Sequence, residues 1–130
     1  MRCFVQEDFN VLALMLNKKG IEPDEMGFSE ERAQTFVMDE DGEIKGFFTL
    51  RKEHGLPYVV HFVSDKGYGL KLGSELKKAL KATGSPRALI SIPDGDKRLF
   101  NGVRRMLHGK LYDAKDGHYF FYMEINHVKI

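Results

Sequence analysis

Apolar residues change their spacing several times along the chain of 130 residues, and each change predicts a different element. Residues 1–5 are typical of a short strand. Over residues 7–20, acids come first, apolar residues recur every three or four positions, and lysines with a glycine come last, which predicts a helix. The apolar face of this helix consists of Phe9, Leu12, Met15 and Leu16. Residues 21–32 are acidic and irregular, with at most a short helical turn.

Strand patterns follow in the middle of the chain. Residues 34–39, 44–52 and 57–64 are rich in β-branched and aromatic side chains, and Asp41-Gly42 between the first two segments is a strong hairpin signal. The third segment, PYVVHFVS, is almost continuously apolar, which is typical of a central strand. We therefore expect an antiparallel meander whose last strand lies near the middle of the sheet.

Helices and strands alternate in the second half. Apolar residues at helical spacing predict a helix that ends at Gly84 and a second helix, which Asp94-Gly95-Asp96 can cap and Gly109 closes. Strands are expected at residues 88–93, 110–113 and 118–125, the last two joined by a turn at residues 115–117. This order predicts an α/β (α+β) fold with a mixed, mostly antiparallel central sheet of six or seven strands flanked by helices. The apolar helix faces are Leu72, Leu76, Ala79 and Leu80, and then Leu99, Phe100, Val103, Met106 and Leu107.

Composition excludes several classes of protein. The chain has 20 Lys and Arg against 19 Asp and Glu, which argues against a protein that binds nucleic acid through bulk charge. Its length predicts a single domain over residues 1–130. No apolar run approaches the roughly 20 residues of a membrane span, and acids interrupt the first residues before any apolar signal core. We therefore expect a cytoplasmic protein.

Cysteine and histidine predict no metal site. Cys3 is the single cysteine, and we expect it to be a small buried residue rather than a nucleophile. Four of the five histidines are scattered and lack the spacing of metal ligands, so we expect no zinc site. These four are His54, His108, His118 and His127.

The most informative segment is VSDKGYGLKLGS, residues 63–74, where a strand ends, a glycine-rich loop follows and an amphipathic helix begins. A helix N-terminus offers unpaired N–H groups and partial positive charge, and glycines let a ligand approach the backbone. Such a loop can hold a diphosphate without net protein charge, and Lys66 and Lys71 could add point charges. The alternative is a plain connection whose glycines serve only the turn.

This segment and the order of the elements resemble the GNAT superfamily, the acetyl-CoA-dependent N-acetyltransferases. The family carries a strand ending in valine, then Arg/Gln-x-x-Gly-x-Gly/Ala at the start of a helix. Val63 matches the valine and Gly73 the second glycine, with Tyr68 and Lys71 at the Arg/Gln and first-glycine positions. The first strand and helix, and the last helix with its closing hairpin, also resemble the family.

The resemblance implies that the fourth and fifth strands splay apart to admit acetyl-CoA. A shifted frame, with Gly67 and Gly69 as the glycine pair, stays open. The cofactor-binding residues that the resemblance implies are Phe62, Val63, Ser64, Tyr68, Gly69, Lys71, Leu72, Gly73 and Ser74.

Catalysis would require a group that removes a proton from an amine. His61 lies on the strand where the family holds the thioester, and histidine titrates near neutrality, so it is the candidate base. The alternatives are a histidine bonded to a neighbour in the sheet, or a water relay to a backbone carbonyl or to Glu43 or Glu53. Tyr68 could donate a proton to the leaving thiolate, or only pack on the adenine.

We therefore expect an N-acetyltransferase that uses acetyl-CoA, acts on an unidentified amine or protein acceptor by direct attack in a ternary complex, and resembles compact members found in phages. The alternative is a GNAT-fold binding or structural protein without catalysis, such as a virion-associated one.

The second half of the chain is basic, which suits the phosphates of CoA or is simply a solvated surface. A nucleic-acid adaptor is a third option for the function. Residues 118–122 are aromatic, which predicts core packing or a homodimer contact.

Overall fold

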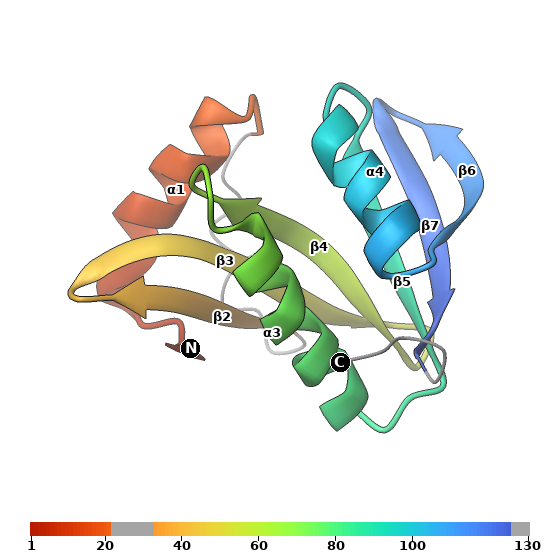
Figure 1. Cartoon of the computed structure of the whole chain (residues 1–130), viewed down its shortest axis with the longest axis horizontal. Helices are drawn as coiled ribbons and strands as arrows, with labels where there is room; N and C mark the ends of the chain where they lie inside the picture. The colour runs from red at the N-terminus through yellow and green to blue at the C-terminus, as the bar shows by residue number, and fades with distance from the viewer. Residues whose placement is uncertain (22–32, 126–130) are drawn as a thin grey trace.

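The structure is a computed structural model, and it describes residues 1–21 and 33–125 (Figure 1). These residues form one seven-stranded sheet in the order β1-β2-β3-β4-β5-β7-β6. Its strands are β1 (Arg2–Cys3), β2 (Ala33–Glu40), β3 (Glu43–Glu53), β4 (Leu56–Ser64), β5 (Arg87–Pro93), β6 (Lys110–Lys115) and β7 (His118–Glu124). The helical elements are η1 (Gln6–Asp8), α1 (Phe9–Lys18), α3 (Gly69–Ala82) and α4 (Lys97–Met106).

The predicted mixed, mostly antiparallel sheet is confirmed, with β4 at its centre. Every strand pair is antiparallel except β4–β5, which is parallel because α3 crosses between the two strands. The predicted hairpin turn is also confirmed, since Asp41 and Gly42 have φ angles of 55° and 83°.

The predicted splay of the fourth and fifth strands is confirmed too. β4 and β5 pair only at Tyr58 with Leu89 and at Val59 with Ile90. Beyond Val59, β4 continues to follow β3 and β5 continues to follow β7, so the two strands diverge (Figure 1). The sheet therefore contains a wedge-shaped opening between its two halves.

Helices cover the two faces of the sheet. On one face, α1 packs Leu12 and Leu16 against Val37, Phe47 and Val63 of β2, β3 and β4. On the other face, α3 and α4 cover the larger core cluster, to which α3 contributes the predicted Leu72, Leu76 and Leu80. The predicted apolar face of α4 is only partly buried: Val103 and the following Leu107 are buried, whereas Leu99, Phe100 and Met106 are partly exposed.

Cys3 and the end of α4 differ from the predictions. Cys3 is exposed, because β1 is a two-residue strand at the edge of the sheet. The left-handed residue after α4 is His108, with φ of 53°, not Gly109. Gly109 instead allows close packing, since a Cβ atom there would lie 2.5 Å from Val103 Cγ1.

Two predictions lie outside the described residues, namely the irregular segment after residue 21 and His127. Within the described residues, no helix is long and apolar enough to cross a membrane. The same residues contain no group of three or more His, Cys, Asp and Glu side chains that could hold a metal ion.

Candidate functional site

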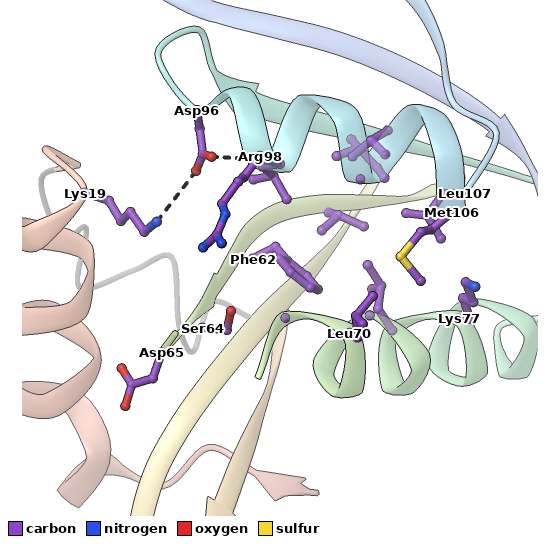
Figure 2. Close-up of a pocket in the computed structure, with 18 of the residues that line it drawn as sticks. Lys19, Phe62, Ser64, Asp65, Leu70, Lys77, Asp96, Arg98, Met106 and Leu107 are labelled. Carbon is purple, nitrogen blue, oxygen red and sulfur yellow. Dashed lines mark hydrogen bonds and ion pairs between the residues drawn. The ribbon is translucent and has the colours of Figure 1, made fainter. Parts of the chain in front are cut away.

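A cavity of about 550 Å³ lies between α3 and α4, over the wedge where β4 and β5 separate (Figure 2). Val59 and Phe62 of β4 and Ile90 of β5 form its floor, so the cavity reaches the last positions at which the two strands pair. The two walls are α3 and α4, and apolar side chains line the wall formed by α4. The volume falls within the roughly 300–1,000 Å³ that is typical of small-molecule sites.

The wall formed by α3 lacks side chains at two positions. Gly69 and Gly73 lie one helical turn apart and both line the cavity. A Cβ atom at Gly73 would meet no heavy atom within 4 Å, and one at Gly69 would meet only Ser64 Oγ at 3.6 Å, an ordinary contact. The fold therefore does not require glycine at either position. Gly67, by contrast, has φ of 92°, so the turn before the helix does require it.

The first turn of α3 presents backbone donors beside these glycines. The carbonyl of Tyr68 accepts the first intrahelical hydrogen bond, from the N–H of Leu72 at 2.9 Å. The N–H groups of residues 69–71 therefore have no acceptor within the helix. Together with the partial positive charge of the helix N-terminus, they form a place that favours an anion.

Positive charge predominates in the described lining of the cavity. It contains four basic residues, Lys19, Lys66, Lys77 and Arg98, and two acidic residues, Asp65 and Asp96. Asp96 is already engaged in two ways. Its Oδ2 lies 3.8 Å from Lys19 Nζ, and its Oδ1 accepts the N–H of Leu99 at 3.1 Å, which caps α4 as predicted. This carboxylate is therefore held at the helix end.

Arg98 lies in the first turn of α4, and its guanidinium extends toward Phe62 (Figure 2). No carboxylate among the described residues forms an ion pair with it. A cation in the first turn of a helix is also opposed by the helix dipole. An anion bound in the cavity would relieve both conditions.

Solved structures of acetyltransferases share the fold of this chain. The PaiA N-acetyltransferase of Thermoplasma acidophilum, solved with coenzyme A, is 15% identical, with a TM-score of 0.70 over 95% of this chain and 96% of that chain. An acetyltransferase of the GNAT family from Staphylococcus aureus is 13% identical, with a TM-score of 0.73 over 95% and 96% of the two chains. The chain has the GNAT fold.

A third GNAT-fold structure, an acetyltransferase of Bacillus subtilis in complex with CoA, is 14% identical, with a TM-score of 0.70 over 95% of this chain and 97% of that chain. No protein-family model matches the sequence, and no curated protein matches it either. The resemblance seen in the sequence is thus confirmed at the level of the fold.

Lysine at the first-glycine position of the GNAT motif does not fill the cavity. The side chain of Lys71 is exposed and points to Glu40 at the end of β2, with which it forms a hydrogen-bonded ion pair. This carboxylate raises the pKa of Lys71. Of the glycines in residues 63–74, Gly67, Gly69 and Gly73 line the cavity, and they include members of both frames of the motif.

The structure brings only some of the predicted cofactor residues to the cavity of this GNAT fold. Phe62, Ser64, Gly69 and Gly73 line it. The other five predicted residues do not line the cavity. Val63 and Leu72 are buried in the two core clusters, and Ser74 is half-buried on α3. Lys71 pairs with Glu40, and the ring of Tyr68 lies 5.5 Å from Lys45 Nζ.

His61 lies on the other face of β4. It is half-buried, does not line the cavity, and has its ring centroid 6.3 Å from that of Phe47, in the cluster under α1. Of the alternative acids, Glu43 pairs with Lys45, which lowers the pKa of its carboxyl and makes it a weaker base. Glu53 pairs with Arg51 at 3.1 Å. The catalytic assignments stay predictions.

Sequence reasoning missed the α4 side of the site. Leu99 and Met106 were predicted only as part of the apolar face of a helix, and they line the cavity together with Arg98 and Gly102. A Cβ atom at Gly102 would also meet nothing within 4 Å. A glycine within the apolar stripe of a predicted helix was a signal that could have pointed to this wall.

Proposed function

We propose that this protein is an acetyl-CoA-dependent N-acetyltransferase that binds acetyl-CoA in the cavity between α3 and α4. The observation that carries the proposal is the set of helical glycines that face the cavity. Gly69, Gly73 and Gly102 have no positive φ and have room for a Cβ atom, so packing does not explain them. Side chains at these positions would occupy the space that a ligand needs.

The polar end of the cavity suits the phosphates of CoA. Around this end lie the N–H groups in the first turn of α3, which have no acceptor within the helix, the turn at Gly67, and the guanidinium of Arg98, which pairs with no carboxylate of residues 1–21 or 33–125. A diphosphate on α3 and a further phosphate on α4 would use both walls.

The floor of the cavity suits the pantetheine arm. From Gly69 to Lys77 the α3 wall extends about 12 Å, at 1.5 Å per residue. Phe62 and Ile90 offer apolar contact along this path. Beyond Val59, the edge of β4 that faces β5 pairs with no other described strand, so its backbone groups are available to the amides of an extended ligand.

Acetyl-CoA supplies an activated thioester, and the protein must orient it and handle the protons. The neutral amine forms a bond to the carbonyl carbon, the carbon–sulfur bond breaks, and the nitrogen loses a proton while the leaving thiolate gains one, so the products are an amide and the CoA thiol. We propose His61 as the group that takes the proton from the amine. Since His61 lies on the side of β4 opposite the cavity, acetyl-CoA and the amine would approach each other from the two sides of the wedge.

One observation favours the alternative, a GNAT-fold binding protein without catalysis. No tyrosine or histidine belongs to the described lining of the cavity, so no such side chain there can protonate the leaving thiolate. Tyr68 would have to turn away from Lys45 to do so. Ligand binding and turnover therefore need separate measurements.

Thermal unfolding with acetyl-CoA or CoA tests the binding step. At a hundredfold excess over Kd, binding should stabilise the protein by about 2.7 kcal/mol, which is a rise in Tm of about 10 °C for a chain of this size. Gly73→Asp should abolish the rise, because its carboxylate would face the phosphates. Gly73→Asn gives the same size without charge, and Ala82→Asp adds the charge at an exposed position outside the cavity. No rise with the unaltered protein would refute the site.

Turnover is tested by release of CoA from acetyl-CoA with a panel of primary amines. His61→Gln should leave the shift in Tm intact, lower kcat and remove the acid limb of the pH–rate profile. An unchanged profile would exclude His61 as the base. Binding of CoA with no release of CoA for any amine would support the alternative.

A further inference from the structure

The inner end of the cavity lies farthest from the first turn of α3, and it consists of Leu76 and Lys77 on α3 and of Met106 and Leu107 at the end of α4. Lys77 follows Gly69 by two helical turns and faces α4 across this end (Figure 2). The other charged residues of the described lining come from the ends of α1 and β4 and from the start of α4. In the part of the chain that the structure describes, Lys77 is therefore the single charge that lines the inner end.

The ammonium group of Lys77 has no acid partner among the described residues. Lys77 is half-buried, yet its side chain forms no ion pair or hydrogen bond with residues 1–21 or 33–125. The adjacent Lys78, by contrast, is exposed and pairs with Glu75 at 3.6 Å. A cation that is partly withdrawn from water without a counter-charge favours an anionic group in the space in front of it.

The surroundings of Lys77 strengthen this preference for an anion. On α3, the next charged side chain one turn further along the helix is Lys81. Arg104 and Arg105 place two more positive charges in the last turn of α4. The floor of the inner end, from β4 and β5, is apolar and contributes no titratable group. The field at the inner end is therefore positive, and no acid of the described lining offsets it there.

The proposed position of CoA identifies the anion that reaches Lys77. In that complex the diphosphate lies at the first turn of α3, and the pantetheine arm follows the roughly 12 Å of helix from Gly69 to Lys77. The phosphates stay at the start of this path, so the group that arrives at Lys77 is the sulfur atom. Met106 gives it a soft, polarisable neighbour, since its own sulfur points from α4 toward the cavity (Figure 2).

We propose that Lys77 binds the sulfur of CoA as a thiolate and returns a proton to it. The proposal rests on the proposed binding of acetyl-CoA in the cavity. When the carbon–sulfur bond breaks, its electron pair stays on the sulfur, and the ammonium group of Lys77 stabilises that charge. Lys77 then donates one proton, CoA leaves as the thiol, and the lysine recovers a proton from solvent. A residue of α3 thus supplies the proton donor that no tyrosine or histidine of the described lining supplies.

This assignment predicts that the affinity for CoA depends on pH. A cation within about 4–6 Å lowers the pKa of an acid by about 1–3, and the partial exposure of Lys77 favours the lower value. An ordinary thiol has a pKa of about 8.5. If binding lowers the pKa of the CoA thiol by about one, CoA binds about tenfold more tightly above the free pKa than below the bound pKa. A thioether of CoA carries no such proton, so its affinity lacks this change.

The experiment measures Kd by calorimetry for CoA and for S-methyl-CoA, a thioether that neither ionises nor transfers an acyl group. The pH runs from about 6.5 to about 9.5, on both sides of the ordinary thiol pKa, with a reductant because Cys3 is exposed. The ratio of the Kd of S-methyl-CoA to that of CoA should rise about tenfold with pH. Lys77→Met, which keeps an apolar stem, should hold the ratio constant, and Lys77→Arg should retain the rise. Lys81→Met, which removes the same charge from an exposed position outside the cavity, is the matched control.

Each other outcome overturns the proposal. A ratio that stays constant in the unaltered protein, or that rises equally in Lys77→Met, would refute the thiolate site and leave the proposed binding of acetyl-CoA standing. Absence of binding for both ligands would refute that binding and the thiolate site together. Intact-mass and peptide mass spectrometry after incubation with acetyl-CoA decide one further point. An acetyl group on Lys77 would show that this lysine is a nucleophile, and the proposal would then be wrong.

Discussion

Replacing Arg98 by glutamine removes the guanidinium that extends into the cavity from α4 and keeps a side chain that donates hydrogen bonds. No described carboxylate pairs with Arg98, and nearby Asp96 is held by Lys19 and by the N–H of Leu99. The substitution therefore exposes no unpaired partner within the described protein, and its effect on unfolding should be small. Its effect on ligand affinity reports the phosphate contact directly.

The magnitude follows from the type of contact and from its exposure. A hydrogen bond to a charged group contributes about 1.5–3 kcal/mol. Arg98 is exposed, so solvent screening reduces this to about 1–2 kcal/mol, which is a loss of affinity of about 5- to 30-fold. Because α3 already offers its N-terminus to the diphosphate, we expect Arg98 on the opposite wall to bind the 3′-phosphate.

Isothermal titration calorimetry with CoA and with 3′-dephospho-CoA tests this assignment. Arg98→Gln should weaken binding of CoA by the stated factor, leave binding of dephospho-CoA unchanged, and reduce the salt dependence of CoA binding. Arg105→Gln removes the same charge from an exposed position of α4 outside the cavity and is the control. Equal losses in the two variants would show that only bulk charge matters, and no loss in Arg98→Gln would refute the contact.

Three further predictions concern the loop and the fold. Lys71→Ala should leave the Kd for CoA unchanged in calorimetry, because this side chain pairs with Glu40 outside the cavity; a tenfold loss would contradict that orientation. Gly109→Ala should lower the free energy of unfolding in urea by about 1–3 kcal/mol, since its Cβ atom would lie 2.5 Å from Val103 Cγ1, and Val103→Ala in the same chain should recover part of the loss. Buried Asp8 accepts two hydrogen bonds from Arg2 and one from a backbone N–H, which lowers its pKa. Ionised Asp8 therefore stabilises the fold fully above about pH 4, and this contribution declines as the pH falls through the lowered pKa. Asp8→Asn should lower the free energy of unfolding by about 2 kcal/mol at pH 7, and the stability of the variant should fall less steeply than that of the unaltered protein at acid pH.

The sequence alone determined the elements, because local rules govern them. Hydrophobic spacing located each described helix and strand to within a few residues, and Asp-Gly pairs marked two hairpin turns, at Asp41 and at Asp116, which both have positive φ. The glycine-rich start of α3 was recognisable for the same reason, since a strand, a loop and a helix N-terminus are adjacent in the chain.

Only the tertiary structure decided which of these residues meet. The cavity depends on the divergence of β4 and β5, which arises because each strand follows a different partner, and no local pattern records that choice. Arg98 and Lys19 reach the cavity from helices far from the motif, while Lys71 within the motif turns away to Glu40. His61 lies on the opposite face from the cavity because side chains alternate along a strand and a bulge resets that alternation. The direction in which each side chain points thus depends on strand register and helix packing, which are long-range properties. The type of each element, in contrast, follows from neighbours in the chain.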